Sequence, residues 1–174
     1  MSERDAKREQ FSDQKKSGSK TFIPIAIVLF AVIAAAGWFL FGTKSVGGPE
    51  FVSAAQDGRI YFAASDFNDG KAKFYRYQGQ SGPVSFFVVK SSDGVVRSAF
   101  DACDVCYKAL KGYRQEGGEM VCINCDQRFP TDKINVVKGG CNPAPLMRQA
   151  VGDKIVIAVA DVEKGAWYFK GAVN

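Results

Sequence analysis

Five cysteines are the residues of this 174-residue sequence whose type and spacing indicate chemistry. They are Cys103, Cys106, Cys122, Cys125 and Cys141. The first four form a C-x2-C-x15-C-x2-C pattern, at the short end of the spacing expected for a four-cysteine metal site. Two residues between cysteines allow a tight turn to direct both thiolates at one ion, and a tetrahedral set of four thiolates suits zinc or iron. The pattern therefore favours metal or cluster ligation.

Two other interpretations of the paired cysteines stay open. Four cysteines outside the cytoplasm are able to form two disulfides, either within each C-x-x-C or between the pairs. A C-x-x-C is also the motif of a thioredoxin-type dithiol, although neither pair is expected at a strand-to-helix junction of a βαβ unit. Titration with an alkylating reagent before and after reduction distinguishes these alternatives from metal ligation.

Cys141 lies apart from the pairs, in the sequence GGCNPAPL. The two glycines allow the backbone to approach a cluster closely, which makes Cys141 a candidate ligand. A lone thiol is otherwise a small buried hydrophobe. Together with Met120 or Met147, Cys141 also has the soft donors of a Cu(I) site, although we expect both methionines to be core residues.

The composition excludes several kinds of chemistry. The sequence has no histidine, which excludes Ser-His-Asp and Cys-His nucleophile pairs, His-ligated zinc hydrolases, blue-copper centres and Rieske clusters. Hydrophobic residues make up 47% and charged residues 24%, which is ordinary for a folded domain. No nucleophile and base are paired, so the sequence indicates a redox or metal-binding module rather than a conventional enzyme, and no organic substrate.

Cationic and aromatic residues surround the cysteine pairs. The cations Lys108, Lys111, Arg114 and Arg128 either offset the negative charge of a thiolate site or form an ordinary solvated hairpin surface. We expect the aromatic residues to be core residues rather than a redox relay. They are Phe86, Phe87, Phe100 and Tyr107.

The sequence predicts a β-rich domain, mainly β with some α, around the cysteines. Apolar alternation predicts strands at 59–64, 72–78, 84–90, 95–100 and 154–159, and a further strand at 167–170. In an alternative interpretation of the last segment, Asp161 caps a short helix that runs through Trp167. Residues 111–115 and 119–121 are expected to form a zinc-ribbon-like hairpin around Gly117-Gly118, which returns the second cysteine pair beside the first.

Residues 21–42 are predicted to form a transmembrane helix. The 21 residues from Phe22 to Gly42 carry no charge, and about 20 apolar residues span a bilayer core. Residues 1–20 hold six Lys/Arg and four Asp/Glu, whereas only Lys44 is basic directly after the span. The positive-inside rule then places residues 1–20 in the cytoplasm and residues 43–174 outside, in a periplasm or at the cell surface. The mixed charge of the tail gives no indication of nucleic-acid binding.

The run AFDACDVCYKALKGYRQEGGEMVCINCDQRFP, followed by INVVKGGCNPAPL, resembles the membrane iron–sulfur-containing proteins of the FtrD-like family. The resemblance covers most of residues 50–170, and the C-D-V-C, C-I-N-C and G-G-C-N-P-A-P-L motifs are complete. It implies an iron or iron–sulfur group held by the four paired cysteines, with Cys141 as a further candidate. Family members occur beside, or fused to, high-affinity iron permeases and partner periplasmic iron-binding proteins.

The resemblance therefore implies an electron-transfer partner of a ferrous iron uptake system. The chain has a single predicted anchor, so a transport pore would belong to a partner. Two alternatives remain: a non-redox protein that binds or delivers iron or copper, and a structural zinc domain in a membrane complex.

Overall fold

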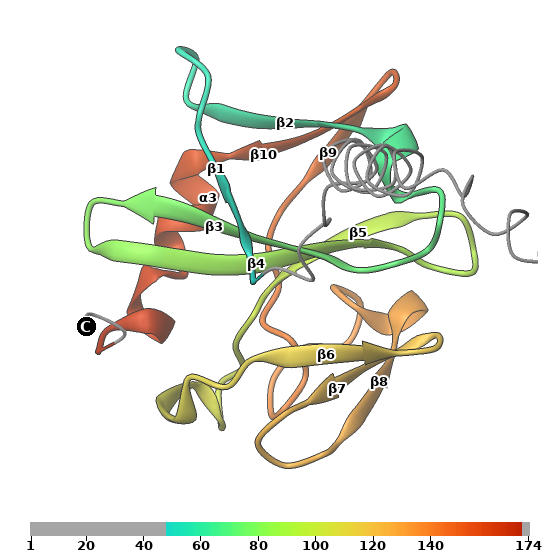
Figure 1. Cartoon of the computed structure of the whole chain (residues 1–174), viewed down its shortest axis with the longest axis vertical. Coiled ribbons are helices and arrows are strands. Elements are labelled where there is room, and N and C mark those ends of the chain that lie inside the picture. Colours follow the sequence, from blue (N-terminus) through green and yellow to red (C-terminus); the bar gives the residue numbers. More distant parts are fainter. Residues whose placement is uncertain (1–47, 172–174) are drawn as a thin grey trace, which may run out of the picture. The chain divides into compact units, whose positions relative to one another are not determined.

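Strand β4 (Gly82–Lys90) is apolar at most positions because both of its faces are buried. In the computed structural model, which describes residues 48–171, Val84, Phe86 and Val88 contact one hydrophobic cluster. Phe87 and Val89, which point to the opposite face, contact a second cluster. Successive side chains of a strand alternate between faces, so β4 lies at the centre of a three-layered arrangement of sheets (Figure 1).

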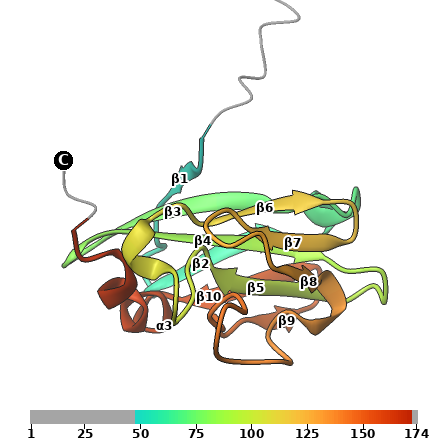
Figure 2. The same cartoon turned by 90° about the horizontal axis from the view of Figure 1, so that it is seen from below.

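Three sheets form the layers (Figures 1 and 2). The central sheet has the order β1-β3-β4-β5, and its additional strands are β1 (Glu50–Val52), β3 (Lys73–Gly79) and β5 (Val96–Phe100). The second sheet is β2 (Arg59–Ala63), β10 (Lys154–Ala158) and β9 (Gln149–Val151). The third sheet is β6 (Tyr113–Glu116), β7 (Glu119–Cys122) and β8 (Arg128–Pro130). All pairings are antiparallel except that of β1 with β3.

Helices are few and short in the described part of the chain. They are α3 (Val159–Lys164) and the 3-10 helices η1 (Ala64–Phe67), η2 (Tyr107–Ala109), η3 (Thr131–Lys133) and η4 (Ala166–Phe169). Within residues 48–171, no helix has the length and apolar character that crossing a membrane requires. The predicted transmembrane helix at 21–42 and the tail at 1–20 lie outside the described residues.

The two hydrophobic clusters occupy the two spaces between the sheets. The first cluster joins β4 to β2 and β10 through residues such as Phe62 and Ile157. The second cluster joins β4 and β5 to the β6–β7 hairpin through Phe87, Tyr113 and Met120. Cys103 and Cys122 belong to this second cluster, so one cysteine of each pair is buried between the central sheet and the third sheet.

Most of the strand predictions are confirmed. The observed strands β2, β3, β4, β5 and β10 match the five predicted segments to within two residues at each end. The predicted hairpin is also confirmed, because β6 and β7 pair with Glu116 opposite Glu119 around the two glycines. The domain is β-rich with few helices, as the sequence indicated.

The prediction of a strand at 167–170 is wrong, because this segment forms the 3-10 helix η4. In this helix Tyr168 is buried, whereas Trp167 is exposed. The alternative cap at Asp161 is wrong too, since helix α3 begins at Val159 without a side-chain cap. Asp161 instead lies in its first turn and accepts a hydrogen bond from Lys164 at 2.7 Å.

Gly165, between α3 and η4, is required by a close contact rather than by its backbone angles. A Cβ atom there would overlap the ring of Phe100, a buried core residue. We expect Gly165→Ala to lower the free energy of unfolding by about 1–3 kcal/mol, measured by urea denaturation, because overpacking displaces the ring. Gly118→Ala is the matched control, since open space surrounds Gly118, and a change within about 0.5 kcal/mol is expected. Equal effects of the two substitutions on the free energy of unfolding would show that the contact with Phe100 does not require glycine at position 165.

Candidate metal centre

The first cysteine pair follows the end of β5 in a hydrogen-bonded turn. Cys103 is 1% exposed, and the backbone N–H of Cys106 donates to its Sγ at 3.2 Å. The N–H of Tyr107 donates to the carbonyl of Cys103 at 3.2 Å and closes this turn. The 3-10 helix η2 then begins with the N–H of Ala109 donating to the Cys106 carbonyl at 3.0 Å. The first pair thus lies between strand β5 and the one-turn helix η2. The neighbouring strands β4 and β5 are antiparallel, so no βαβ unit surrounds it.

The second pair begins at the last residue of β7. Cys122 is 1% exposed and lies opposite Tyr113 in the β6–β7 hairpin. The N–H of Asp126 donates to the Cys122 carbonyl at 2.9 Å, and Asp126 adopts a positive φ of 56° to close the turn. This turn leaves Cys125 exposed at the surface.

Cys141 is brought to the pairs by a turn at Gly139 and Gly140. Both glycines have positive φ, 83° and 62°, a conformation that glycine adopts without a steric penalty. The Tyr113 hydroxyl donates to the Cys141 carbonyl at 2.6 Å. The Sγ atoms of Cys141 and Cys106 are 3.8 Å apart. The structure thus places Cys141 among the other cysteines rather than alone in the core.

All five predicted cysteines meet in what we call the cysteine centre. In the described part of the chain their sulfur atoms form two groups, each with all Sγ atoms within 4.8 Å of one another. One group is Cys103, Cys106 and Cys122, and the other is Cys106, Cys125 and Cys141. A tetrahedral ion with metal–sulfur distances of about 2.3 Å separates its ligand sulfurs by about 3.8 Å. The donor type and the spacing therefore fit a thiolate-bound metal.

Burial and hydrogen bonding make the five thiols unequal. Burial raises the pKa of Cys122 to about 11 and that of Cys141 to about 12. The backbone N–H of Gln127 stabilises the Cys125 thiolate and lowers its pKa. A thiolate is the form that binds metal, so metal binding at Cys122 and Cys141 would release protons near neutral pH.

The neighbouring cations differ in whether they form ion pairs. Arg114 forms ion pairs with Glu116 at 2.7 Å and Asp126 at 3.0 Å. Arg128 pairs with Glu116 at 2.6 Å, so both arginines form the ion-paired hairpin surface that was one of the two interpretations of these cations. Within residues 48–171, Lys108 and Lys111 are exposed and form no ion pair.

The two methionines differ from each other. Met120 is fully buried in the second hydrophobic cluster, as expected for a core residue. Met147 is 63% exposed, so the prediction that it is a core residue is wrong. Its exposure follows from its position between the buried Leu146 and the strand β9, whose residues are all exposed.

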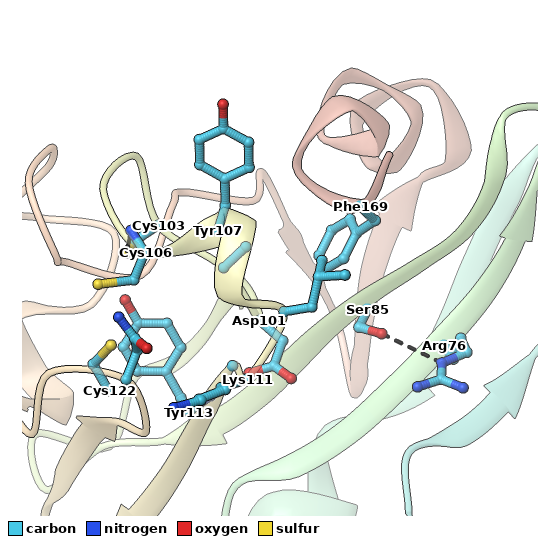
Figure 3. A pocket seen from close by; sticks show the side chains of 14 residues that line it. Arg76, Ser85, Asp101, Cys103, Cys106, Tyr107, Lys111, Tyr113, Cys122 and Phe169 are labelled. Carbon is cyan, nitrogen blue, oxygen red and sulfur yellow. Dashed lines mark hydrogen bonds between the residues drawn. The ribbon is translucent and has the colours of Figure 1, made fainter. Parts of the chain in front are cut away.

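A cavity of about 100 Å³ borders the centre. Cys103, Cys106 and Cys122 contribute to its wall, together with Asp101 and Lys111. Figure 3 shows Asp101 between the cysteines and the Arg76–Ser85 pair. Burial raises the pKa of Asp101 to about 6, partly opposed by the N–H of Tyr113, which donates to its carboxylate at 2.7 Å.

Tyr113 is the site residue that sequence reasoning missed. Its ring is 4% exposed and lies near Phe87 and Phe129, with centroids 6.2 and 6.3 Å away. Burial, together with the nearby Cys103, Cys122 and Cys141, raises the pKa of its phenol far above its usual value. The feature that could have identified Tyr113 is its position in the predicted hairpin, directly opposite Cys122.

Tyr113→Phe is expected to loosen the Cys141 segment without disturbing the aromatic packing. Losing a hydrogen bond worth about 1 kcal/mol raises the population of the open conformation of that segment about fivefold. Alkylation of Cys141 in the metal-free protein, followed by peptide mapping, measures this increase. Tyr61→Phe is the control, because the Tyr61 hydroxyl donates to Asp57 instead. An unchanged rate in Tyr113→Phe would show that the phenol does not hold the segment.

A comparison with known protein families found a match. The family model described as membrane iron-sulfur containing protein FtrD-like matches residues 67–169, more than half of the chain and a range that includes all five cysteines. No curated protein and no solved structure matches the sequence. The chain belongs to the FtrD-like family of membrane iron–sulfur-containing proteins.

Proposed function

We propose that this protein is a membrane-anchored electron-transfer partner of a ferrous iron uptake system. The observation that carries the proposal is the meeting of five free cysteines from three separate segments of the chain. The proposed ligands are Cys103, Cys106, Cys122, Cys125 and Cys141. Cysteine thiolates are the usual ligands of iron–sulfur groups, which supply reversible transfer of single electrons when bound.

The exposure of the centre supports electron transfer to another protein. Cys125 is exposed, so a partner is able to approach a ligand of the centre directly. The two turns also present apolar side chains to solvent, since Val105 is 63% and Ile123 is 38% exposed. Lys108 and Lys111 add positive charge beside them, and cations near a cluster raise its reduction potential.

The proposal includes an anchor at residues 21–42. This segment would hold residues 43–174 outside the cytoplasmic membrane, in a periplasm or at the cell surface, with residues 1–20 in the cytoplasm. Tethering raises the effective concentration of the centre near a partner in the same membrane. The proposed partners are an iron permease and periplasmic iron-binding proteins, as the family resemblance implies.

A structural zinc domain is the second candidate function, and the burial of two ligands favours it. Cys103 and Cys122 are each 1% exposed within the second hydrophobic cluster. A closed four-thiolate zinc site would contribute to folding and would not transfer electrons. Non-redox delivery of iron or copper would instead depend on the exposed Cys125.

Uptake of radioactive ferrous iron tests the proposal in cells that carry the gene. Deleting the gene is expected to lower uptake, and the intact protein is expected to restore it. Cys106→Ser should fail to restore uptake, whereas the control Met147→Leu, at an exposed position, should restore it fully. Full restoration by Cys106→Ser would show that uptake does not depend on the cysteine centre.

A further inference from the structure

The second sheet carries a cavity on the face that points away from the core. Ile155 and Ile157 of β10 belong to the first hydrophobic cluster, so Val156 between them points to the opposite face. The cavity there has a volume of about 310 Å³, within the range of pockets that bind small molecules. It shares no lining residue with the cavity beside the cysteine centre. Its lining residues are Arg59, Met147, Arg148, Gln149, Val156, Ala158 and Asp161.

Arg148 places a half-buried positive charge at the wall of this cavity. Among residues 48–171, no carboxylate pairs with Arg148, and its Nε donates to the Val96 carbonyl. Burial and the neighbouring Arg97 lower the pKa of Arg148. The charge of Arg97 is balanced by Asp93 at 2.7 Å, whereas that of Arg148 is not. An anion bound in the cavity would supply the missing negative charge.

Arg59 supplies a second guanidinium to the same cavity. Its side chain is exposed, and its ion pair with Asp57 is long, at 4.0 Å. The N–H groups of each arginine match the two oxygens of a carboxylate, so two arginines fit a ligand with two carboxylates. Val156 and Ala158 add an apolar wall, which a carbon skeleton contacts and an inorganic anion does not.

Asp161 adds a hydrogen-bond acceptor to the lining. Its Oδ1 accepts a hydrogen bond from Lys164 at 2.7 Å, and within residues 48–171 its Oδ2 accepts none. A carboxylate repels a second carboxylate but accepts a hydrogen bond from a hydroxyl group. The lining therefore fits a ligand that carries a hydroxyl group as well as carboxylates.

We propose that this cavity binds a small hydroxydicarboxylate. Its two carboxylates pair with Arg59 and Arg148, and its hydroxyl group donates to Asp161. The apolar wall formed by Val156 and Ala158 contacts its carbon skeleton. This site is separate from the cysteine centre, so the proposal goes beyond the proposed function and does not depend on electron transfer or on a bound metal.

Isothermal titration calorimetry of the detergent-purified full chain with L-malate tests this proposal. Succinate is the matched ligand, because it differs from malate only in lacking the hydroxyl group. We expect succinate to bind about fivefold more weakly than malate, since the hydrogen bond to Asp161 is lost. Inorganic phosphate at the same ionic strength should bind more weakly than either dicarboxylate, because it makes no contact with the apolar wall.

Variants locate the binding in the cavity. Arg59→Gln and Arg148→Gln should each weaken malate binding about tenfold or more, because each removes a charge-assisted pair with a carboxylate. Arg59 is exposed, so Arg59→Gln decides the test even if Arg148→Gln fails to fold. Lys71→Gln is the control, because it removes an equal charge at an exposed position outside the cavity, and it should bind malate like the intact chain.

Two results would overturn the proposal. One is the absence of binding to the intact chain at millimolar malate, and the other is equal malate affinity of Arg59→Gln and Lys71→Gln. Succinate binding as tight as that of malate would overturn the role of Asp161. Calorimetry measures ligand binding rather than electron transfer, so each result stands whether or not the protein serves iron uptake.

Discussion

Removal of the bound metal is expected to lower the melting temperature of the protein by about 10 °C or more. Metal–thiolate binding in small domains contributes about 10–16 kcal/mol to folding, because no preformed site exists in the unfolded chain. This domain also has two hydrophobic clusters of its own, so we expect a loss of only about 4 kcal/mol on metal removal. At about 3 °C per kcal/mol for a domain of this size, the shift is about 10 °C.

The physical reason is the position of the ligands within the fold. Cys103 and Cys122 lie in the cluster between the central sheet and the third sheet, and Cys141 comes from a separate segment. A metal bound by these cysteines would join these segments, whereas the metal-free thiols make no covalent link. Intrinsic tryptophan fluorescence during heating measures the transition before and after anaerobic chelation.

Two controls make this result specific to the centre. Adding metal back should restore the original transition, and Cys125→Ser should lower the melting temperature of the loaded protein less than Cys122→Ser, because Cys125 is exposed. Identical melting temperatures with and without metal would show that the cysteines do not hold the sheets together.

Deletion of residues 21–42 is expected to move the protein from the membrane fraction to the soluble fraction. An apolar helix of about 20 residues inserts almost irreversibly, so the intact chain should stay in the pellet after alkaline carbonate extraction. The shortened chain should appear almost entirely in the supernatant, as measured by immunoblotting of both fractions.

Deletion of residues 2–20 is the matched control for this experiment. It removes the charged tail and keeps the apolar segment, so the protein should remain in the pellet. If the chain without residues 21–42 also stayed in the pellet, the anchor would have to lie elsewhere.

Much of the fold follows from the alternation of apolar residues. The predicted strands were correct where one face or both faces of a strand are buried, as in β2 and β4. Strands β1, β8 and β9 were missed because each has three residues, too few to show alternation. In η4, Trp167 and Tyr168 resemble a strand in sequence, but the contact of Phe100 with Gly165 belongs to the tertiary fold and is not visible locally.

The composition of the cysteine centre was predictable, but its internal arrangement was not. The C-x-x-C spacing identified four of the cysteines, and the two glycines before Cys141 indicated the fifth. Which sulfurs are neighbours depends on how the turn at Gly139 and Gly140 and the β6–β7 hairpin meet in space. The ion pairs of Arg114 and Arg128 depend on the register of the same hairpin, so the sequence alone left two interpretations of their charges open.

The central claim is that the cysteine centre holds a redox-active iron group. It is tested most directly by iron, zinc and acid-labile sulfide analysis of the full chain purified without oxygen, together with its visible absorption spectrum. We predict iron with sulfide and a visible band that bleaches on reduction and returns on oxidation. Stoichiometric zinc without a visible band, or five cysteines that react with an alkylating reagent only after reduction, would contradict the claim.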